Sequence, residues 1–454
     1  MTEATTIVGS VDEVPPARQL VPLAFQHVLV MYAGAITVPL VIGRALNLDA
    51  HAMTLLVNAD LVACGIATLI QTLGFGRMIG IRLPIMMGVT FASVSPMLAL
   101  IASGNAAGRA PEMTLATIYG SVIVAGIFGF VAAPVVGRMA RFFPPVVTGT
   151  VILMMGLSLM RVGIDWAAGG RPNDPGYGMP LQLLLAATTL VVVLLLMRFG
   201  RGLVRSGAVL FGAVIGTLIA MALGQTDFSE VAAAPWFALV RPFQFGWPRF
   251  ELSMSLAMCL VMLTVLVESF GMFLAAGALV GREADQKALI RGLRADAAGT
   301  LIGGVFNTFP YTSYAQNIGL LSVTGVRSRF VCAGGGVILL LFGLCPKMAA
   351  VVSAVPVSVL GGAGLIMFGM IAASGVRILG SVEMTSGRLL TVAVSVAIGL
   401  IPVLSDQFFK HLPASLTPLT HSGIVLATIC AVFLNLFFDG DAEATDAEPG
   451  HVIP

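Results

Sequence analysis

A single acidic side chain lies deep inside an apolar stretch of the sequence. Glu268 occurs in "MCLVMLTVLVESFGMFLAAGALV", where apolar and small residues surround it on both sides. An ionisable group near the centre of a bilayer costs at least about 2.5 kcal/mol on insertion scales, so it normally serves a function. We therefore predict that Glu268 belongs to a substrate or proton site. The alternative is a protonated carboxyl group that bonds to a helix backbone.

A pair of adjacent amide side chains occurs in the segment "FPYTSYAQNIG", residues 309–319. Buried amides cost free energy unless they form hydrogen bonds. The Gln316 amide both donates and accepts, and the Glu268 carboxylate accepts from ring N–H groups. Together the two side chains would fit a flat heterocycle whose edge alternates donors and acceptors. A buried acid whose charge depends on whether the site is filled would also couple binding to protons.

Asp296 is a second acid in an apolar segment, predicted at 290–306. We expect it near the start of this segment, where an acid in the first turn of a helix simply complements the helix dipole. The alternative is that Asp296 supports the site. A small-residue face formed by Gly299 and Gly303 would then hold it against a neighbouring helix.

Two more ionisable residues lie within predicted membrane segments. His27 occurs in the first segment, predicted at 20–42. A lone membrane histidine serves as a structural hydrogen-bonding group or as a proton relay, and the sequence does not decide between them. Asp60 is interpreted as a membrane-entry residue without a role in the site.

The composition defines the class of protein that holds these residues. The chain is 57% hydrophobic and 10% charged, with a mean hydropathy of +0.98, whereas a soluble domain is nearer a quarter charged. We predict an all-α polytopic membrane protein. No basic run suggests nucleic acid, no cluster has the spacing of a metal site, and no nucleophile motif suggests an enzyme. The five cysteines are interpreted as packing residues.

Apolar stretches of about 20 residues, the length needed to cross a bilayer, predict fourteen membrane segments. Most lysines and arginines fall on one side of this arrangement, which predicts that both termini are cytoplasmic. Seven segments on each side of a polar linker give halves of opposite orientation, the inverted repeat typical of secondary transporters. The predicted units are a disordered cytosolic leader at 1–19, a first repeat at 20–223, a linker at 224–252, a second repeat at 253–438 and an acidic cytosolic tail at 439–454.

Proline and glycine interrupt the third and the tenth of these segments. The third begins "LPIMMGVTFASVSPML" and the tenth begins "FPYTSYAQNIGLLSVTG". Interrupted segments at matching positions of two repeats indicate a transporter's binding site. We expect a short extended stretch after Pro84 and after Pro310, each followed by a half-helix whose free N–H groups point at a shared site. The alternative is a pair of kinked helices, because proline and glycine are common in membrane helices.

The segment "QNIGLLSVTGVRSR" resembles the signature of the nucleobase–ascorbate transporter family, Gln/Glu/Pro-Asn-x-Gly-x-x-x-x-Thr. Gln316, Asn317, Gly319 and Thr324 stand at the matching positions. "AFQHVLVMYAGAITVPLVIG", "VESFGMFLAAG" and "GLRADAAGTLIGG" extend the similarity over nearly the whole chain. The resemblance implies fourteen spans in two inverted repeats, with a core domain of segments 1–4 and 8–11 and a gate domain of segments 5–7 and 12–14. It also implies a homodimer through the gate domain, and symport with protons as the coupling ion and no cofactor.

The resemblance further implies roles for individual residues. Glu268 matches the family's substrate-binding glutamate, and Gln316 matches its second side-chain contact. Ala315 and Phe91 would offer backbone groups to the substrate, and the Phe91 ring would be a further contact. Thr90 matches a position that varies with specificity. Three polar positions match residues that support the site or the coupling: His27, Asp296 and Asn317.

The first residue of the signature narrows the substrate class. In the family, Glu at this position marks uracil carriers, Pro marks ascorbate carriers, and Gln marks carriers of xanthine and uric acid. Gln316 therefore predicts an oxidised purine. Thr90, where xanthine-preferring relatives often carry Asn, favours uric acid, and Met272 replaces the histidine of many uracil-type members. The prediction is a proton-coupled uric acid importer in the lipid of the bacterial cytoplasmic (inner) membrane. The alternatives are a xanthine- or uracil-preferring symporter and an uncoupled anion channel.

Overall fold

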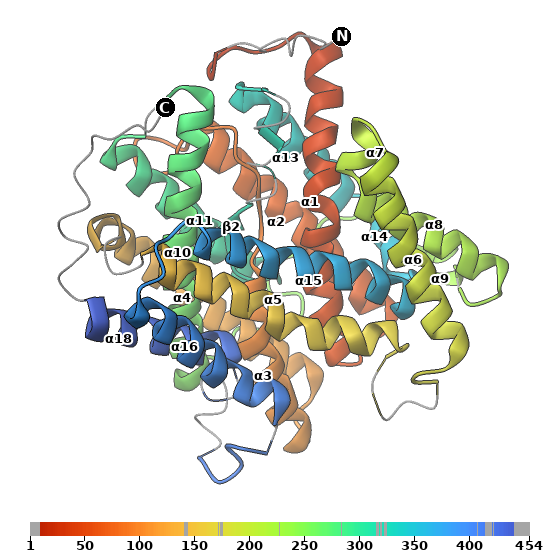
Figure 1. Cartoon of the computed structure of the whole chain (residues 1–454). Helices are drawn as coiled ribbons and strands as arrows, with labels where there is room; N and C mark the ends of the chain where they lie inside the picture. Colours follow the sequence, from red (N-terminus) through yellow and green to blue (C-terminus); the bar gives the residue numbers. More distant parts are fainter. Residues whose placement is uncertain are drawn as a thin grey trace.

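The computed structural model describes residues 10–139, 144–170, 172, 176–226, 228–282, 284–314, 317, 320–321, 325–405, 407–413, 420 and 422–439. Helices dominate this part of the chain (Figure 1). The first half holds α1 (Ala17–Ala45), α2 (Ala50–Leu73), β1 (Met87–Val89), η1 (Phe91–Ser93), α3 (Val94–Ala106), α4 (Pro111–Met139), α5 (Pro145–Ala167), α6 (Pro180–Phe199), α7 (Leu203–Ser206), α8 (Ala208–Ala222) and α9 (Ser229–Ala233). The second half holds α10 (Leu252–Val280), α11 (Gln286–Val305), β2 (Tyr311–Ser313), α13 (Arg329–Gly343), α14 (Pro346–Ser353), α15 (Val357–Leu379), α16 (Ser386–Leu404) and α18 (Gly423–Asp439).

The length and composition of these helices fit a membrane. Eight helices in the described residues are long and apolar enough to cross one, and α13 and α14 form a further pair bent by 81°. Three shorter apolar helices accompany them. The chain is therefore a polytopic all-α membrane protein, as the sequence predicts. The number fourteen stays a prediction, because α11 carries charged side chains and part of the segment after β2 lies outside the described residues.

The two interrupted segments pair with each other. β1 and β2 run antiparallel, with Gly88 opposite Thr312 and Val89 opposite Tyr311. β1 comes from the first half of the chain and β2 from the second, so their opposite directions agree with an inverted repeat. The extended stretch predicted after each proline is confirmed. After β1 the chain turns through η1 into α3, which is the half-helix expected there.

The helices pack in two groups. In the first group, α1, α2, α10 and α11 contact the β1–β2 pair, α4 packs on α10 and α11, and α13 packs on α1 and α2. In the second group, α5 and α15 run alongside each other, and α6, α8, α16 and α18 pack around them (Figure 1). Each group contains helices of both halves, so neither half folds as a separate unit. The assignment of these groups to a core domain and a gate domain stays a prediction.

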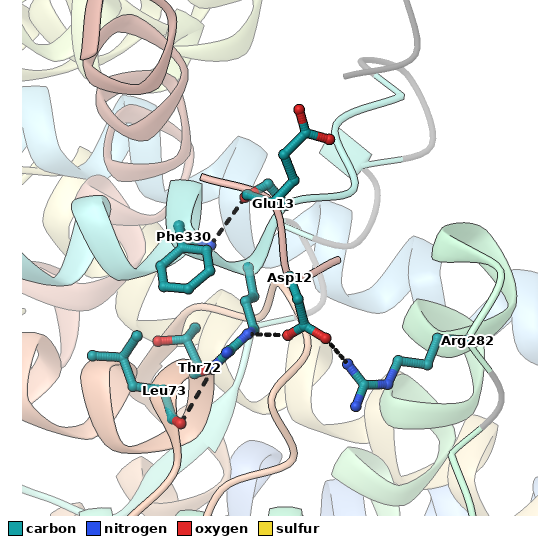
Figure 2. A network of polar contacts seen from close by, with 8 residues as sticks. Asp12, Glu13, Thr72, Leu73, Arg282 and Phe330 are labelled. Atoms are coloured by element: carbon teal, nitrogen blue, oxygen red, sulfur yellow. Dashed lines mark hydrogen bonds and ion pairs between the residues drawn. The ribbon is translucent and has the colours of Figure 1, made fainter. Parts of the chain in front are cut away.

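Residues 10–16, which precede α1, lie against the ends of other helices (Figure 2). The Asp12 carboxylate accepts from Arg329 Nε at 2.7 Å and from Arg282 Nη1 at 3.1 Å. Arg329 Nη1 also donates to the carbonyl of Thr72, near the end of α2, at 2.8 Å. This part of the leader therefore bridges α2, α13 and the connection between α10 and α11.

Candidate substrate site

Four residues predicted for the site or the signature lie outside the described residues: Ala315, Gln316, Gly319 and Thr324. The distance between the Glu268 carboxylate and the Gln316 amide therefore stays a prediction. The geometry that follows concerns the other predicted residues, which come from α1, the β1–η1 segment, α10, α11 and the first turn after β2.

Glu268 lies in the middle of α10, and its side chain is half-buried. Its neighbour Ser269 is fully buried and shares a hydrogen bond of 3.3 Å with the hydroxyl of Thr312 in β2. This contact fixes the stretch of α10 that carries Glu268 beside the β1–β2 pair. Within the described part of the chain no hydrogen bond or ion pair holds the Glu268 carboxylate. The alternative in which it bonds to a helix backbone is thus not found among these residues.

Asp296 is fully buried in α11. Its Oδ1 accepts from Gln71 Nε2 at 2.8 Å and from the Ser313 hydroxyl at 3.1 Å. Gln71 Oε1 in turn accepts from the backbone N–H of Ile81 at 3.1 Å. Asp296 therefore ties α11 to α2 and to β2, directly behind the strand pair.

The position expected for Asp296 within its helix is wrong. α11 begins at Gln286, and Asp285 caps its N-terminus by accepting from Ala288 N at 2.6 Å. Asp296 lies in the helix interior, so it does not complement the dipole of a first turn. The predicted segment began at residue 290, one turn after the observed start of α11, which placed Asp296 closer to the helix start than it is.

His27 and Asn317, both predicted as supporting residues, contact each other. The Asn317 side-chain nitrogen donates to the His27 carbonyl at 3.1 Å and lies 3.0 Å from His27 Nδ1. Both residues are buried. The pair joins α1 to the first turn after β2, so it holds the start of the signature segment against the first helix.

Thr90 and Phe91 lie between β1 and α3. The Thr90 hydroxyl accepts from Ala92 N at 3.2 Å and so caps η1. The Thr90 N–H donates to the Pro310 carbonyl at 2.8 Å, which continues the β1–β2 pairing by one residue. The buried ring of Phe91 makes an edge contact with Phe368 of α15, with 6.0 Å between the ring centroids. This contact joins the two helix groups at the level of the strands.

The interpretation of Asp60 as a membrane-entry residue is wrong, because it lies in the middle of α2 and is fully buried. Its Oδ1 accepts from the Tyr311 hydroxyl at 2.8 Å and from the Thr308 hydroxyl at 2.9 Å. Asp60 thus fixes both β2 and the turn that leads into it. The apolar residues around Asp60 were the only sequence signal for this role.

Tyr314 fills a narrow space beside β1. A Cβ added to Gly88 would lie 2.5 Å from a carbon of the Tyr314 ring, and one added to Gly34 of α1 would also meet that side chain. Both glycines are therefore required by close packing rather than by an unusual backbone conformation. Together with the Asp60 and Asp296 contacts, this packing makes the strand pair rigid. The stretch of α10 that carries the half-buried Glu268 lies beside this strand pair.

Comparison with known proteins agrees with a membrane carrier. Residues 18–408 match the family model Xan_ur_permease, described as Permease family. The chain is 49% identical over 432 residues to the uric acid transporter UacT of Escherichia coli (strain K12), covering 95% of this chain and 88% of that protein. It is 45% identical to the uric acid permease PucJ of Bacillus subtilis (strain 168), covering 92% of each chain. It is 41% identical to the xanthine permease of the same organism, covering 94% of this chain and 95% of that one.

Solved structures share the fold. The transmembrane domain of a cyanobacterium bicarbonate transporter, BicA, matches 94% of this chain and 99% of its own length, with a TM-score of 0.58 and 18% identity. The murine anion transporter Slc26a9 in the inward-facing state matches 93% of this chain and 69% of its own, with a TM-score of 0.59 and 12% identity.

The fold and the family match define a multi-pass membrane transporter with two inverted repeats, and not an enzyme. The chain belongs to this permease family, and the resemblance to the nucleobase–ascorbate transporters read from the signature is confirmed.

Proposed function

We propose that this permease is a proton-coupled symporter that imports an oxidised purine by alternating access. Uric acid is the proposed substrate, and xanthine is the alternative within the same class. The observation that carries the proposal is Glu268, a half-buried acid in the middle of a membrane helix whose carboxylate has no hydrogen-bond partner within the described residues. A charged carboxylate is costly in a membrane unless a ligand pairs with it or a proton neutralises it.

The chemistry of a purine fits this arrangement. A carboxylate accepts from ring N–H groups, and an amide such as Gln316 donates and accepts along the same edge. We propose that Glu268, Gln316 and Thr90 hold the heterocycle, with the backbone of Ala315 and Phe91. His27, Asp296 and Asn317 would support them from behind the strands.

The substrates named for the relatives favour a purine over a pyrimidine. Two of them are uric acid carriers and one is a xanthine permease, at 41–49% identity over nearly the whole chain. Gln316 is the signature residue expected for xanthine and uric acid carriers, which disfavours uracil. Thr90 favours uric acid over xanthine. A uracil-preferring symporter is the alternative within the family whose substrate differs most from uric acid.

Proton coupling is proposed from the buried acids. Asp296 is fully buried, and its Oδ2 has no hydrogen-bond partner in the described part of the chain. A buried carboxylate is expensive when charged, so a proton that enters or leaves with the substrate would relieve this cost. An uncoupled anion channel is the alternative from another class, and its flux would ignore the proton gradient.

The orientation and assembly follow the sequence arguments. Both termini are proposed to be cytoplasmic, because most basic residues lie in the leader and in the loops on its side. The exposed apolar surface of α6, which includes Leu184, Leu194 and Leu195, fits lipid or a second copy of the chain. We propose the homodimer through the gate domain that the family resemblance implies.

Uptake of radiolabelled urate and xanthine tests the function, in bacterial cells that lack their own purine permeases. We expect urate to accumulate, unlabelled xanthine to compete, and uracil not to compete. An uncoupler should stop accumulation. Accumulation that persists with the uncoupler would refute the coupling, and absence of both purine fluxes from correctly inserted protein would refute the substrate class.

A further inference from the structure

One buried acid beside the strand pair has no part in the proposed mechanism. Asp60 lies in the middle of α2 and is fully buried. Within the described residues its Oδ1 contacts the Tyr311 and Thr308 hydroxyls, and the Cys64 thiol lies 3.8 Å from its Oδ2. None of these groups is a cation. A buried carboxylate without a cationic partner is costly while it is charged, so binding a proton would remove this cost.

The hydrogen bonds around Asp60 fit both the charged and the neutral acid. The Tyr311 hydroxyl oxygen lies 2.8 Å from Asp60 Oδ1 and 2.9 Å from the Asp60 backbone carbonyl oxygen. In the charged acid, Oδ1 accepts from Tyr311 and from the Thr308 hydroxyl at 2.9 Å. In the neutral acid, Oδ1–H donates to the Tyr311 oxygen, while the Tyr311 O–H turns to the backbone carbonyl. A hydroxyl both donates and accepts, so a proton can bind or leave when one hydroxyl rotates.

A short polar route links Asp60 to the surface of the 224–252 linker. Thr308 follows Asn307, a buried residue in the left-handed conformation with a φ of 65°. The Asn307 side chain donates to the carbonyl of Arg241 at 2.7 Å, and Arg241 is exposed. Two consecutive residues therefore connect Asp60 to an exposed part of the chain. In the proposed orientation this linker faces the outside of the cell, from which the protons enter.

Asp60 is also joined to the purine site through β2. Tyr311 is the first residue of β2, and the next residue, Thr312, shares a hydrogen bond of 3.3 Å with Ser269. Ser269 follows Glu268 in α10. A proton on Asp60 changes the hydrogen bonds of Tyr311, so it acts on the strand that fixes the stretch around Glu268. Two ligands that act on one element affect each other's binding reciprocally.

Few ionisable groups face Asp60 from the described part of the chain: Cys64, Tyr311 and, near enough for an electrostatic interaction, Tyr314. The helices α1, α11, α13 and α14 and the strand β1 also pack on α2. Among their described residues no acidic or basic side chain bonds to Asp60. The acid of α11, Asp296, bonds instead to Gln71, about three turns further along α2. The charge of Asp60 therefore depends on its own proton.

We propose that Asp60 is a binding site for the coupling proton, which arrives from the outer surface along Asn307 and Thr308. This inference rests on the proposed function, because only a proton-coupled carrier would use such a site. The proton forms an O–H bond with Oδ1 of the carboxylate, and the same bond breaks when the proton leaves toward the cytoplasm. The purine stays chemically unchanged, and Glu268 stays available to hold it.

Asp60→Asn separates proton coupling from the fold. Asparagine has the size of the acid, and its side-chain oxygen still accepts from the Tyr311 and Thr308 hydroxyls, but it cannot bind or release a proton. In proteoliposomes, we expect this variant to lose the accumulation of labelled urate that a proton gradient drives. Exchange of external labelled urate for internal unlabelled urate needs no net proton movement, so it should continue.

Asp49→Asn is the matched control for the transport measurements. Asp49 is an exposed acid that caps the start of the same helix, and asparagine is also a good N-cap residue. We expect this variant to keep both the accumulation and the exchange of urate.

Infrared spectroscopy detects the proton without any transport. A protonated carboxyl group has a C=O stretch that the carboxylate lacks, so this band should grow when the pH of the reconstituted protein is lowered. We expect part of the band to be missing in Asp60→Asn. Tyr311→Phe is a second variant that keeps the acid. Because the Tyr311 hydroxyl bonds to the Asp60 carboxyl group, the Asp60 part of the band should shift in frequency in this variant.

Three results would overturn the assignment of Asp60. One is accumulation by Asp60→Asn that an uncoupler still abolishes, as in the unmodified chain. Another is loss of exchange together with accumulation in correctly inserted Asp60→Asn, which indicates a structural role. The third is a carboxyl band that is the same in the unmodified chain and in Tyr311→Phe, a comparison that holds even where Asp60→Asn fails to insert.

Failure of the proposed function would look different. The unmodified chain would then carry no urate, or it would accumulate urate in the presence of an uncoupler. The infrared bands would still decide whether Asp60 takes up a proton.

Discussion

The Tyr311 hydroxyl donates a hydrogen bond of 2.8 Å to the carboxylate of Asp60, across 251 residues of chain. Both side chains are fully buried. Asp60 belongs to a long helix of the first half, and Tyr311 begins the strand of the second half. The bond therefore fastens the strand pair beside the proposed purine site to α2, a helix that contributes none of the predicted site residues.

Removing either partner of this bond should destabilise the protein. Tyr311→Phe or Asp60→Ala leaves a buried polar group short of a partner, which costs about 1–3 kcal/mol. The pair should be non-additive in a double-mutant cycle, because both changes remove the same bond. Thermal unfolding of the purified protein, followed together with urate uptake, measures this effect.

Tyr177→Phe is the matched control for that experiment. Its hydroxyl also bonds to an aspartate, Asp165, at 3.0 Å, but it lies in a connection outside the long helices. We expect a smaller loss of stability there. Equal losses of stability for Tyr177→Phe and Tyr311→Phe would show that the buried bond stabilises the fold no more than a bond in a connection does. Strict additivity of the Asp60 and Tyr311 changes would show that the two side chains do not stabilise each other.

Glu268→Gln should abolish accumulation of urate and leave the amount of protein in the membrane unchanged. Glutamine keeps the size of the side chain but replaces the carboxylate, which accepts only, by an amide. Because no hydrogen bond to Glu268 occurs within the described residues, the fold should lose little stability. Initial uptake rates and membrane immunoblots test both expectations.

Glu251→Gln is the corresponding control, since Glu251 immediately precedes α10 and pairs with Arg109 at 3.3 Å. This partly exposed ion pair should matter little. Uptake that survives Glu268→Gln would remove Glu268 from the site. Equal loss of uptake in both variants would point to a general effect of charge in this region.

Much of the fold could be predicted because a membrane imposes a local rule on the sequence. Every span must be apolar along its own length. The apolar stretches of the sequence therefore predicted α1, α2, α5 and α10 without knowledge of the helices that pack against them. The interruptions at Pro84 and Pro310 were also local signals, and they correctly gave the two strands. The antiparallel direction of those strands agrees with the odd number of segments predicted for each half, whereas their pairing was not predicted.

The predictions that proved wrong concern the places of individual polar residues in the fold. Asp60 has partners 248 and 251 residues away, so its own neighbours in sequence gave no hint of them. Asp296 was placed near a helix start because the predicted segment left out the charged first turn of α11, which contains Lys287.

Asp12→Asn should weaken the contact of the leader with the helix ends, and only at low ionic strength. Asp12 accepts from Arg329 and Arg282, but it is largely exposed, so the loss should stay below about 1 kcal/mol. Salt screens such pairs, so the unfolding midpoints of the two proteins should converge in high salt. Glu13→Gln, which changes the neighbouring acid, should have no comparable effect. A midpoint difference that is independent of salt would contradict an electrostatic role for Asp12.

Gly88→Ala should disrupt the strand pair. The new Cβ would lie 2.5 Å from the Tyr314 ring, whose side chain is buried and packs on Gly34 on its other side. Overpacking of this kind costs about 1–3 kcal/mol, and it would shift β1 against β2, so both thermal stability and uptake should fall.

Gly271→Ala provides the control, since nothing lies within 4 Å of a Cβ at Gly271, which is in α10 near Glu268. Tyr314→Ala makes room for the added methyl group, so the double variant should lose less than the sum of the two single losses. Full uptake and stability in Gly88→Ala would mean that the strand pair tolerates movement, and the rigid frame inferred for the purine site would then be incorrect.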